Sequence, residues 1–192
     1  MILYRLTKTK YLSTAWTGYG AKEAGGRWNS VGVSMVYVSE TASLTMLETL
    51  VHLHAAQIMD SFTLLSIDVP DELIQSANMD ELPDNWADED APQELADYGD
   101  AWSFTRSSVA LRVPSALSPV EFNYLLNPEH PEFYGIVQKA QQIPFRFDSR
   151  LKPDRKCSKG AEGVVMMPGA PVRCHIKKPA SGGQRLHTAI TG

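Results

Sequence analysis

Residues 25–54 gather four side chains that could do chemistry: Arg27, Tyr37, Glu48 and His52. Arg27 follows a glycine pair, which lets a backbone approach a phosphate closely, and a guanidinium binds phosphate oxygens through a forked pair of hydrogen bonds. The stretch contains neither GxGxxG nor a Walker loop, so neither standard nucleotide fingerprint applies. Arg27 is therefore either an anion-binding residue or an ordinary loop arginine.

Glu48 belongs to a predicted helix that Ser39 or Thr41 caps and that runs to about Met59. At roughly 100° per residue, Glu48 falls inside an apolar stripe of this helix. The stripe contains Leu44, Leu47, Val51, Ala55 and Ile58, and a second apolar face carries Met46, Leu50 and Leu53. The pattern predicts a helix that is covered on two sides, one of which contains a carboxylate.

A carboxylate in an apolar stripe costs free energy unless it is paired or hydrogen-bonded. We interpret Glu48 either as a site residue or as one half of a structural ion pair, with Arg27 or Arg5 as its partner. His52, one turn later, is either a packing histidine or a residue that supports Glu48.

Tyr37 and three further residues are candidates for substrate contacts. Tyr37, at a strand end, could stack on a ring or donate a hydrogen bond, although a core tyrosine is the simpler interpretation. Ser115 follows a proline after a strand and lacks the GxSxG setting of a nucleophile elbow. Asn123 lies in an apolar strand, where its amide needs partners. Trp28 is a core or rim aromatic beside Arg27 and joins the substrate-binding candidates for that reason.

The elements that must position these residues are short and mixed. Strands are predicted at 1–6, 34–38, 62–69, 109–113, 121–126 and 143–147. Beside the Glu48 helix, shorter helices are predicted near 72–74, at 92–107 and at 131–140, and residues 8–23 read as a loop. This order predicts a compact α+β domain over residues 1–151. Residues 152–192 are rich in Gly, Pro, Lys and Ser and predict an irregular, poorly ordered tail.

Charge is distributed unevenly along the 192 residues. Residues 1–151 carry 10 basic and 20 acidic side chains, whereas residues 152–192 carry 8 basic and 2 acidic ones. The acidic body argues against direct nucleic-acid binding by the main domain. Cys157 and Cys174 lack metal-ligand spacing, so we expect no metal. No apolar run approaches a membrane span and no signal peptide opens the chain, so we expect a cytoplasmic protein with no membrane contact.

Taken together, several motifs resemble one family. GGRWNSVG, MVYVSE and MLETLVHL are followed by GDAW, by LRVPSALSPVEFNYLLNPEHPEF and by FRFDSRL. This order resembles the RES domain, the toxin half of bacterial Xre–RES type II toxin–antitoxin pairs. The family is named for an Arg, a Glu and a Ser, which match Arg27, Glu48 and Ser115, while Tyr37 and Asn123 fall in matching blocks. The resemblance covers about residues 1–151.

The resemblance implies a fold related to ADP-ribosyltransferases, with NAD+ as a substrate and no cofactor. It implies a toxin that depletes NAD+ by cleaving the nicotinamide–ribose bond, through hydrolysis or phosphorolysis, and so arrests growth. Two alternatives stay open: an ADP-ribosyltransferase that modifies a protein, and a non-catalytic partner of the antitoxin in operon regulation.

The resemblance also implies partners and roles. An Xre-family helix-turn-helix antitoxin would cover the active site of the toxin and form larger assemblies with the toxin. The toxin would contact DNA only indirectly, through this antitoxin. Glu48 would stabilise the positive charge that develops on the ribose, and Arg27 would bind the pyrophosphate or ribose side. Tyr37 would stack on or orient nicotinamide, and Ser115 and Asn123 would line the opposite wall.

Overall fold

The structure, a computed structural model, describes residues 1–53, 61–151, 166–167 and 170–171. The chain divides into two units, Met1–Pro153 and Asp154–Gly192. In the second unit the described residues form two short antiparallel strands, β8 (Met166–Met167) and β9 (Ala170–Pro171). All the candidate site residues belong to the first unit.

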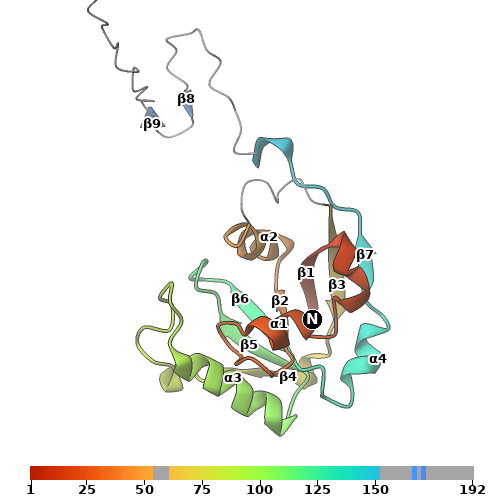
Figure 1. The fold of residues 1–192 in the computed structure, drawn as a ribbon, viewed down its shortest axis with the longest axis vertical. Helices are drawn as coiled ribbons and strands as arrows, with labels where there is room; N and C mark the ends of the chain where they lie inside the picture. The colour runs from red at the N-terminus through yellow and green to blue at the C-terminus, as the bar shows by residue number, and fades with distance from the viewer. Residues whose placement is uncertain (54–60, 152–165, 168–169, 172–192) are drawn as a thin grey trace, which may run out of the picture. The chain divides into compact units, whose positions relative to one another are not determined.

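A seven-stranded sheet forms the centre of the first unit (Figure 1). Its strand order is β4-β5-β6-β2-β1-β3-β7, and among these strands β4 and β5 run parallel while the other neighbours are antiparallel. The strands are β1 (Ile2–Lys8), β2 (Val36–Ser39), β3 (Phe62–Asp68), β4 (Ile74–Ser76), β5 (Ala110–Pro114), β6 (Phe122–Leu126) and β7 (Gln141–Ile143). Strands β1 and β3 pair along their whole length, whereas β1 meets β2 at the single pair Tyr4 and Ser39.

Helices cover both faces of this sheet. They are α1 (Tyr19–Ala24), α2 (Ala42–Leu50), α3 (Gln93–Thr105) and α4 (Phe133–Val137), with 3-10 turns at Thr9–Thr14, Asp71–Leu73, Met79–Glu81 and Ser149–Leu151. Helix α3 packs in one cluster with Leu125, and α4 packs in another with Tyr124 and Leu126. Because alternate residues of a strand point to opposite faces, α3 and α4 cover opposite faces of the sheet. Mixed strands and helices around one sheet confirm the predicted α+β class.

Helix α2 confirms one prediction and corrects two. Thr41 is its N-cap, because the Leu44 amide donates to the Thr41 hydroxyl at 3.0 Å. The helix ends at Leu50 rather than near Met59; residues 51–53 lie outside it, and the rest of the predicted helix lies outside the described residues. The predicted stripe is also wrong in part, since Leu47 is 41% and Val51 54% exposed.

The burial of α2 follows from how it docks on the sheet. Ala42 and Met46 pack against a cluster around Leu6, and the Thr45 hydroxyl donates to the Tyr4 carbonyl of β1 at 3.3 Å. This docking turns the side of the helix that carries Leu47 toward solvent. Each predicted face therefore packs in part: Leu44 of the first stripe is 1% exposed, and Met46 of the second face packs against the Leu6 cluster.

Three other predicted elements differ from the structure. Residues 8–23 are not a plain loop, since they include the 3-10 turn and most of α1. The predicted helix near 72–74 is the 3-10 turn Asp71–Leu73, followed at once by β4. The last strand is Gln141–Ile143 and not 143–147, because Pro144 has no amide to donate to a ladder.

Candidate functional site

A carboxylate held by two side chains lies where α2 meets the ends of β5 and β6. Glu48 Oε1 accepts hydrogen bonds from Ser115 Oγ at 2.9 Å and from Asn123 Nδ2 at 2.5 Å. Within the described residues, Glu48 Oε2 has no hydrogen-bond partner. One oxygen of the carboxylate is therefore fixed by the protein, and the other is available to a ligand.

The orientation of both donors is itself determined by neighbouring groups. Ser115 Oγ accepts from the backbone amides of Leu117 at 3.1 Å and Ser118 at 3.2 Å, so its own proton goes to Glu48. Asn123 Oδ1 accepts from Ser39 Oγ at 2.7 Å, which turns its NH₂ group toward Glu48. Ser115 therefore acts as a hydrogen-bond donor to Glu48 here.

The loop between β5 and β6 is tied to the start of α2. Glu121 accepts from Ser118 Oγ at 2.7 Å and from Thr41 Oγ1 at 2.9 Å, and these two hydrogen bonds lower the pKa of the Glu121 carboxyl. Glu40 Oε1 accepts from the Phe122 amide at 3.0 Å. These contacts join the loop that carries the serine to the helix that carries the carboxylate, which fixes their separation.

A second group of residues builds the turn over residues 26–29, here called the Arg27 turn. The Tyr37 phenol donates to Asn29 Oδ1 at 2.7 Å and accepts from the Trp28 amide at 3.1 Å. The side-chain Nδ2 of Asn29 donates to the carbonyls of Ala21, Ser30 and Val33. Burial raises the pKa of the Tyr37 phenol, which keeps its proton available for Asn29. Tyr37 thus stabilises the Arg27 turn with both hydrogen-bonding functions of its hydroxyl.

Helix α3 supports the same turn from the other side. Asp100 accepts from the Ser30 amide at 3.1 Å, and Gly99 lets α3 approach the Trp28 carbonyl closely. Trp28 itself is 3% exposed and meets Tyr98 edge-on, with ring centroids 6.4 Å apart. Trp28 is therefore a core residue that anchors the turn.

Glu48, Ser115 and Asn123, here called the Glu48 group, lie on the same face of the sheet as the Arg27 turn. Tyr37 and Ser39 are alternate residues of β2, so their side chains point the same way, roughly 7 Å apart along the strand. Tyr37 contacts the turn and Ser39 contacts Asn123, so β2 joins the two groups.

The ion pair that we considered for Glu48 is not seen in the described part of the chain. Arg27 donates to backbone carbonyls at positions 86 and 88, and Arg5 Nη1 donates to the Tyr37 carbonyl at 2.6 Å. The partners of Glu48 are neutral because the β5–β6 loop and β6 place Ser115 and Asn123 within hydrogen-bond distance of its carboxylate. The His52 side chain is exposed and makes no hydrogen bond to the Glu48 group among the described residues.

Sequence reasoning missed several residues that shape the site. Ser39, Asn29 and Asp100 are structural partners of the candidates, and no local pattern marks them. Arg5 did carry a signal, since it interrupts an apolar strand. Burial lowers the pKa of its guanidinium to about 10, and its Nε is buried with no hydrogen-bond partner in the described residues.

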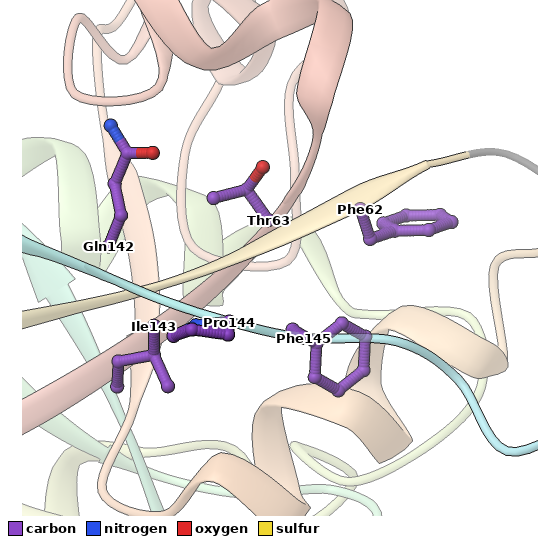
Figure 2. Close-up of a pocket in the computed structure, with 6 residues that line it drawn as sticks. All are labelled: Phe62, Thr63, Gln142, Ile143, Pro144 and Phe145. Atoms are coloured by element: carbon purple, nitrogen blue, oxygen red, sulfur yellow. The ribbon is translucent and has the colours of Figure 1, made fainter.

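A hollow at the β3–β7 edge of the sheet is separate from this site (Figure 2). It is lined by Phe62, Thr63, Gln142, Ile143, Pro144 and Phe145, none of which hydrogen-bonds to the Glu48 group.

Among the described residues, no cluster of His, Cys, Asp and Glu is arranged to hold a metal ion. No described helix combines the length and apolar character that crossing a membrane requires.

The fold and the site define a class of protein: an α+β domain in which a carboxylate held by serine and asparagine shares a sheet face with an arginine turn. The sequence matches the RES domain family over residues 2–148, and the chain belongs to this family. The predicted family is thereby confirmed.

Curated relatives extend over most of the chain. A protein of Yersinia enterocolitica named Toxin Res is 42% identical over 152 residues, which cover 79% of this chain and 100% of that protein. A Toxin Res of Photorhabdus laumondii is 40% identical over 156 residues, covering 81% of this chain and 100% of the relative. A Sphingobium protein named Prs ADP-ribosylating toxin is 39% identical over 139 residues, 70% of this chain and 85% of that protein.

A solved structure shares the fold. A chain of the crystal structure of the M. tuberculosis MbcT–MbcA toxin–antitoxin complex superposes with a TM-score of 0.57 at 21% identity, covering 74% of this chain and 81% of the other. At this identity the likeness concerns the fold.

Proposed function

We propose that the protein is the toxin of a toxin–antitoxin pair and that it depletes NAD+ in the cytoplasm by cleaving the nicotinamide–ribose bond, which arrests growth. The observation that carries the proposal is the Glu48 carboxylate, with one oxygen fixed by Ser115 and Asn123 and the other facing no described protein group. A fixed carboxylate of this kind stabilises positive charge without having to reorganise during the reaction.

Cleavage of the nicotinamide–ribose bond needs little catalytic help beyond the negative charge of Glu48. The bond between ribose C1′ and the nicotinamide ring nitrogen breaks, and its electron pair neutralises the pyridinium, which is already a good leaving group. The ribose becomes oxocarbenium-like, and an oxygen of water or phosphate forms the new bond to C1′; attacking water then loses a proton. Glu48 Oε2 would stabilise the cation and accept a hydrogen bond from a ribose hydroxyl, as carboxylates do in glycosidases.

The other residues would act by position. Arg27 would bind the pyrophosphate, for which a guanidinium is geometrically suited. Ser115 and Asn123 would orient Glu48, and Tyr37 would hold the Arg27 turn, because its hydroxyl is already engaged there. Trp28, buried beneath that turn, would support it in the same way, whereas His52 lies outside the hydrogen-bonded group.

A second candidate differs only in the acceptor of the ADP-ribose. The Sphingobium relative bears the name of an ADP-ribosylating toxin and is 39% identical to this chain. The same bond would break, and a protein side chain would take the place of water. Labelled protein after incubation with NAD+ distinguishes this reaction from hydrolysis.

An antitoxin is the proposed partner. The fold neighbour comes from a toxin–antitoxin complex. Four apolar side chains on the segments that carry Glu48 and Ser115, here called the rim, are open to solvent: Leu47 at 41%, Val51 at 54%, Leu117 at 39% and Val120 at 81%. We expect a helix-turn-helix antitoxin to cover this rim and to provide any contact with DNA. If the protein acted solely through that partner in operon regulation, it would not consume NAD+.

The test is nicotinamide release from NAD+ by the purified protein, with and without phosphate. Glu48→Gln should reduce the rate by at least about a hundredfold while leaving the fold unchanged, because it removes the charge and keeps the shape. Glu132→Gln is the matched control: it neutralises an exposed carboxylate at the start of α4, outside the contacts that position Glu48. Equal release by wild type and Glu48→Gln would refute the assignment. No release by the wild type under any condition would favour the regulatory partner.

A further inference from the structure

The Arg27 side chain is held by a segment far away in the sequence. Its Nη1 donates to the Trp86 carbonyl at 2.7 Å and its Nη2 to the Asp88 carbonyl at 2.8 Å. These acceptors lie 59 and 61 residues further along the chain. A guanidinium has five N–H donors in one plane, so these two bonds fix its orientation and leave donors for a ligand.

The segment that supplies these carbonyls, residues 83–91, is here called the strap. It consists of turns and bends between the Met79–Glu81 turn and α3. Backbone hydrogen bonds from Trp86 to Pro83 and from Asp88 to Asn85 stabilise its curvature. The Trp86 ring is partly buried and packs in the cluster that contains Trp28 and Leu95. Trp86 is therefore the side chain that anchors the strap over Arg27.

The strap fixes Arg27 without neutralising it. Four of its residues are acidic, and no Lys or Arg occurs between Arg27 and Arg106. Even so, no carboxylate of the described chain lies within salt-bridge distance of Arg27; the bonds that hold it come from neutral backbone carbonyls. Arg27 is therefore oriented by neutral acceptors, and no carboxylate of the described residues pairs with it, which leaves its charge available to an anionic ligand.

We propose that the strap is the positioning segment for the anionic part of the substrate. The Trp86 and Asp88 carbonyls hold the guanidinium so that its remaining N–H groups face the pyrophosphate of a dinucleotide. This inference rests on the proposed function. The pyrophosphate lies away from the bond that breaks and has the same charge in the ground and transition states. The strap consequently contributes to substrate affinity and not to the rate of bond cleavage.

The decisive variant is Trp86→Ala, which removes the anchor and lets the strap and Arg27 move. We expect the KM for NAD+ to rise about tenfold, which corresponds to ~1.4 kcal/mol, with kcat changed by less than about twofold. The matched control is Asn85→Ala, which alters an exposed side chain of the same strap and should leave both constants unchanged.

A double-mutant cycle separates positioning from a general structural role. Arg27→Lys alone should raise KM, because an ammonium cannot bridge both carbonyls and bind phosphate in a fork. Adding Trp86→Ala to Arg27→Lys should raise it little further if the strap acts through Arg27. Fully additive effects would overturn the inference, since they would mean that the strap and Arg27 act independently.

Hydrogen exchange gives a second readout that does not depend on the tryptophan variant folding. In Glu48→Gln, whose turnover should be at least about a hundredfold slower, amides in residues 83–91 should exchange more slowly when NAD+ is added. Faster exchange would mean that the substrate displaces the strap, and unchanged exchange would mean that it does not contact Arg27; both overturn the inference. If NAD+ neither binds nor is cleaved, the proposed function fails, and the strap inference fails with it.

Discussion

Gly99 in the middle of α3 offers a test of how the Arg27 turn is held. Glycine in a helix interior is about 1 kcal/mol less favourable than alanine, so an exposed Gly→Ala change would stabilise the protein. At Gly99 a Cβ atom would lie 2.0 Å from the Trp28 carbonyl oxygen, 3.0 Å from its carbon and 3.3 Å from the Trp28 Cβ. The neighbouring atoms are largely backbone, so they cannot yield by a simple rotamer change.

The sign of the Gly99→Ala effect follows from these two opposing terms. Overpacking a well-filled interior costs ~1–3 kcal/mol, and a contact this close to backbone belongs at or above the upper end of that range. Subtracting the helix-propensity gain of about 1 kcal/mol leaves a net loss of about 2 kcal/mol. For a protein of this size that loss corresponds to roughly 4–8 °C in Tm.

Urea unfolding of Gly99→Ala beside Gly135→Ala provides the measurement. Gly135 lies in α4 with nothing within 4 Å of an added Cβ, so its alanine variant should gain ~0.4–1 kcal/mol. The midpoint of Gly99→Ala should fall with an unchanged slope, and its KM for NAD+ should rise because the Trp28 carbonyl and the adjacent Arg27 are pushed aside. A Gly99→Ala variant as stable as the Gly135→Ala variant would refute the proposed close packing of α3 on the turn.

Two further predictions address the two halves of the site. Asn123→Leu removes one of the two donors to Glu48, so kcat for nicotinamide release should fall by about tenfold to a hundredfold with little change in KM; an unchanged kcat would show that Asn123 does not orient the carboxylate. Tyr37→Phe removes the hydroxyl that joins Asn29 and the Trp28 amide, and should cost about 1–3 kcal/mol of unfolding free energy at about pH 8. Because burial raises the Tyr37 pKa, the unfolded wild type loses that proton first and its stability falls above about pH 10, so the penalty of Tyr37→Phe should shrink there. A penalty that is constant from about pH 8 to about pH 11 in urea titrations would contradict a raised pKa.

Local sequence was sufficient for much of the fold. The β-branched and apolar runs at 62–69 and 121–126 predicted strands close to the observed β3 and β6. Residue type limited the cap of α2 to Ser39 or Thr41, and the structure has Thr41. Strand β4 was missed because three residues are too few for a periodic pattern, and pairing with β5 makes it a strand. Pro144 ended β7 earlier than the aromatic run 145–147 suggested.

For the site, the residue types predicted candidates but not the hydrogen bonds that join them. Glu48 stood out by its place in an apolar stripe and Asn123 by its amide in an apolar strand, whereas Ser115 became a candidate through the order of the family's motifs. Of the two interpretations of Glu48, the ion pair with Arg27 or Arg5 is not seen among the described residues, where neutral donors hold the carboxylate.

Tertiary structure decided these partners because they are distant in the chain. Antiparallel pairing sets Asn123 opposite Ser39, 84 residues away, and the strap reaches Arg27 from 59 residues further on. The register of the sheet and the path of the strap arise from the packing of the whole domain. No local pattern therefore indicates that, among the described residues, one oxygen of Glu48 accepts no hydrogen bond and the charge of Arg27 meets no carboxylate.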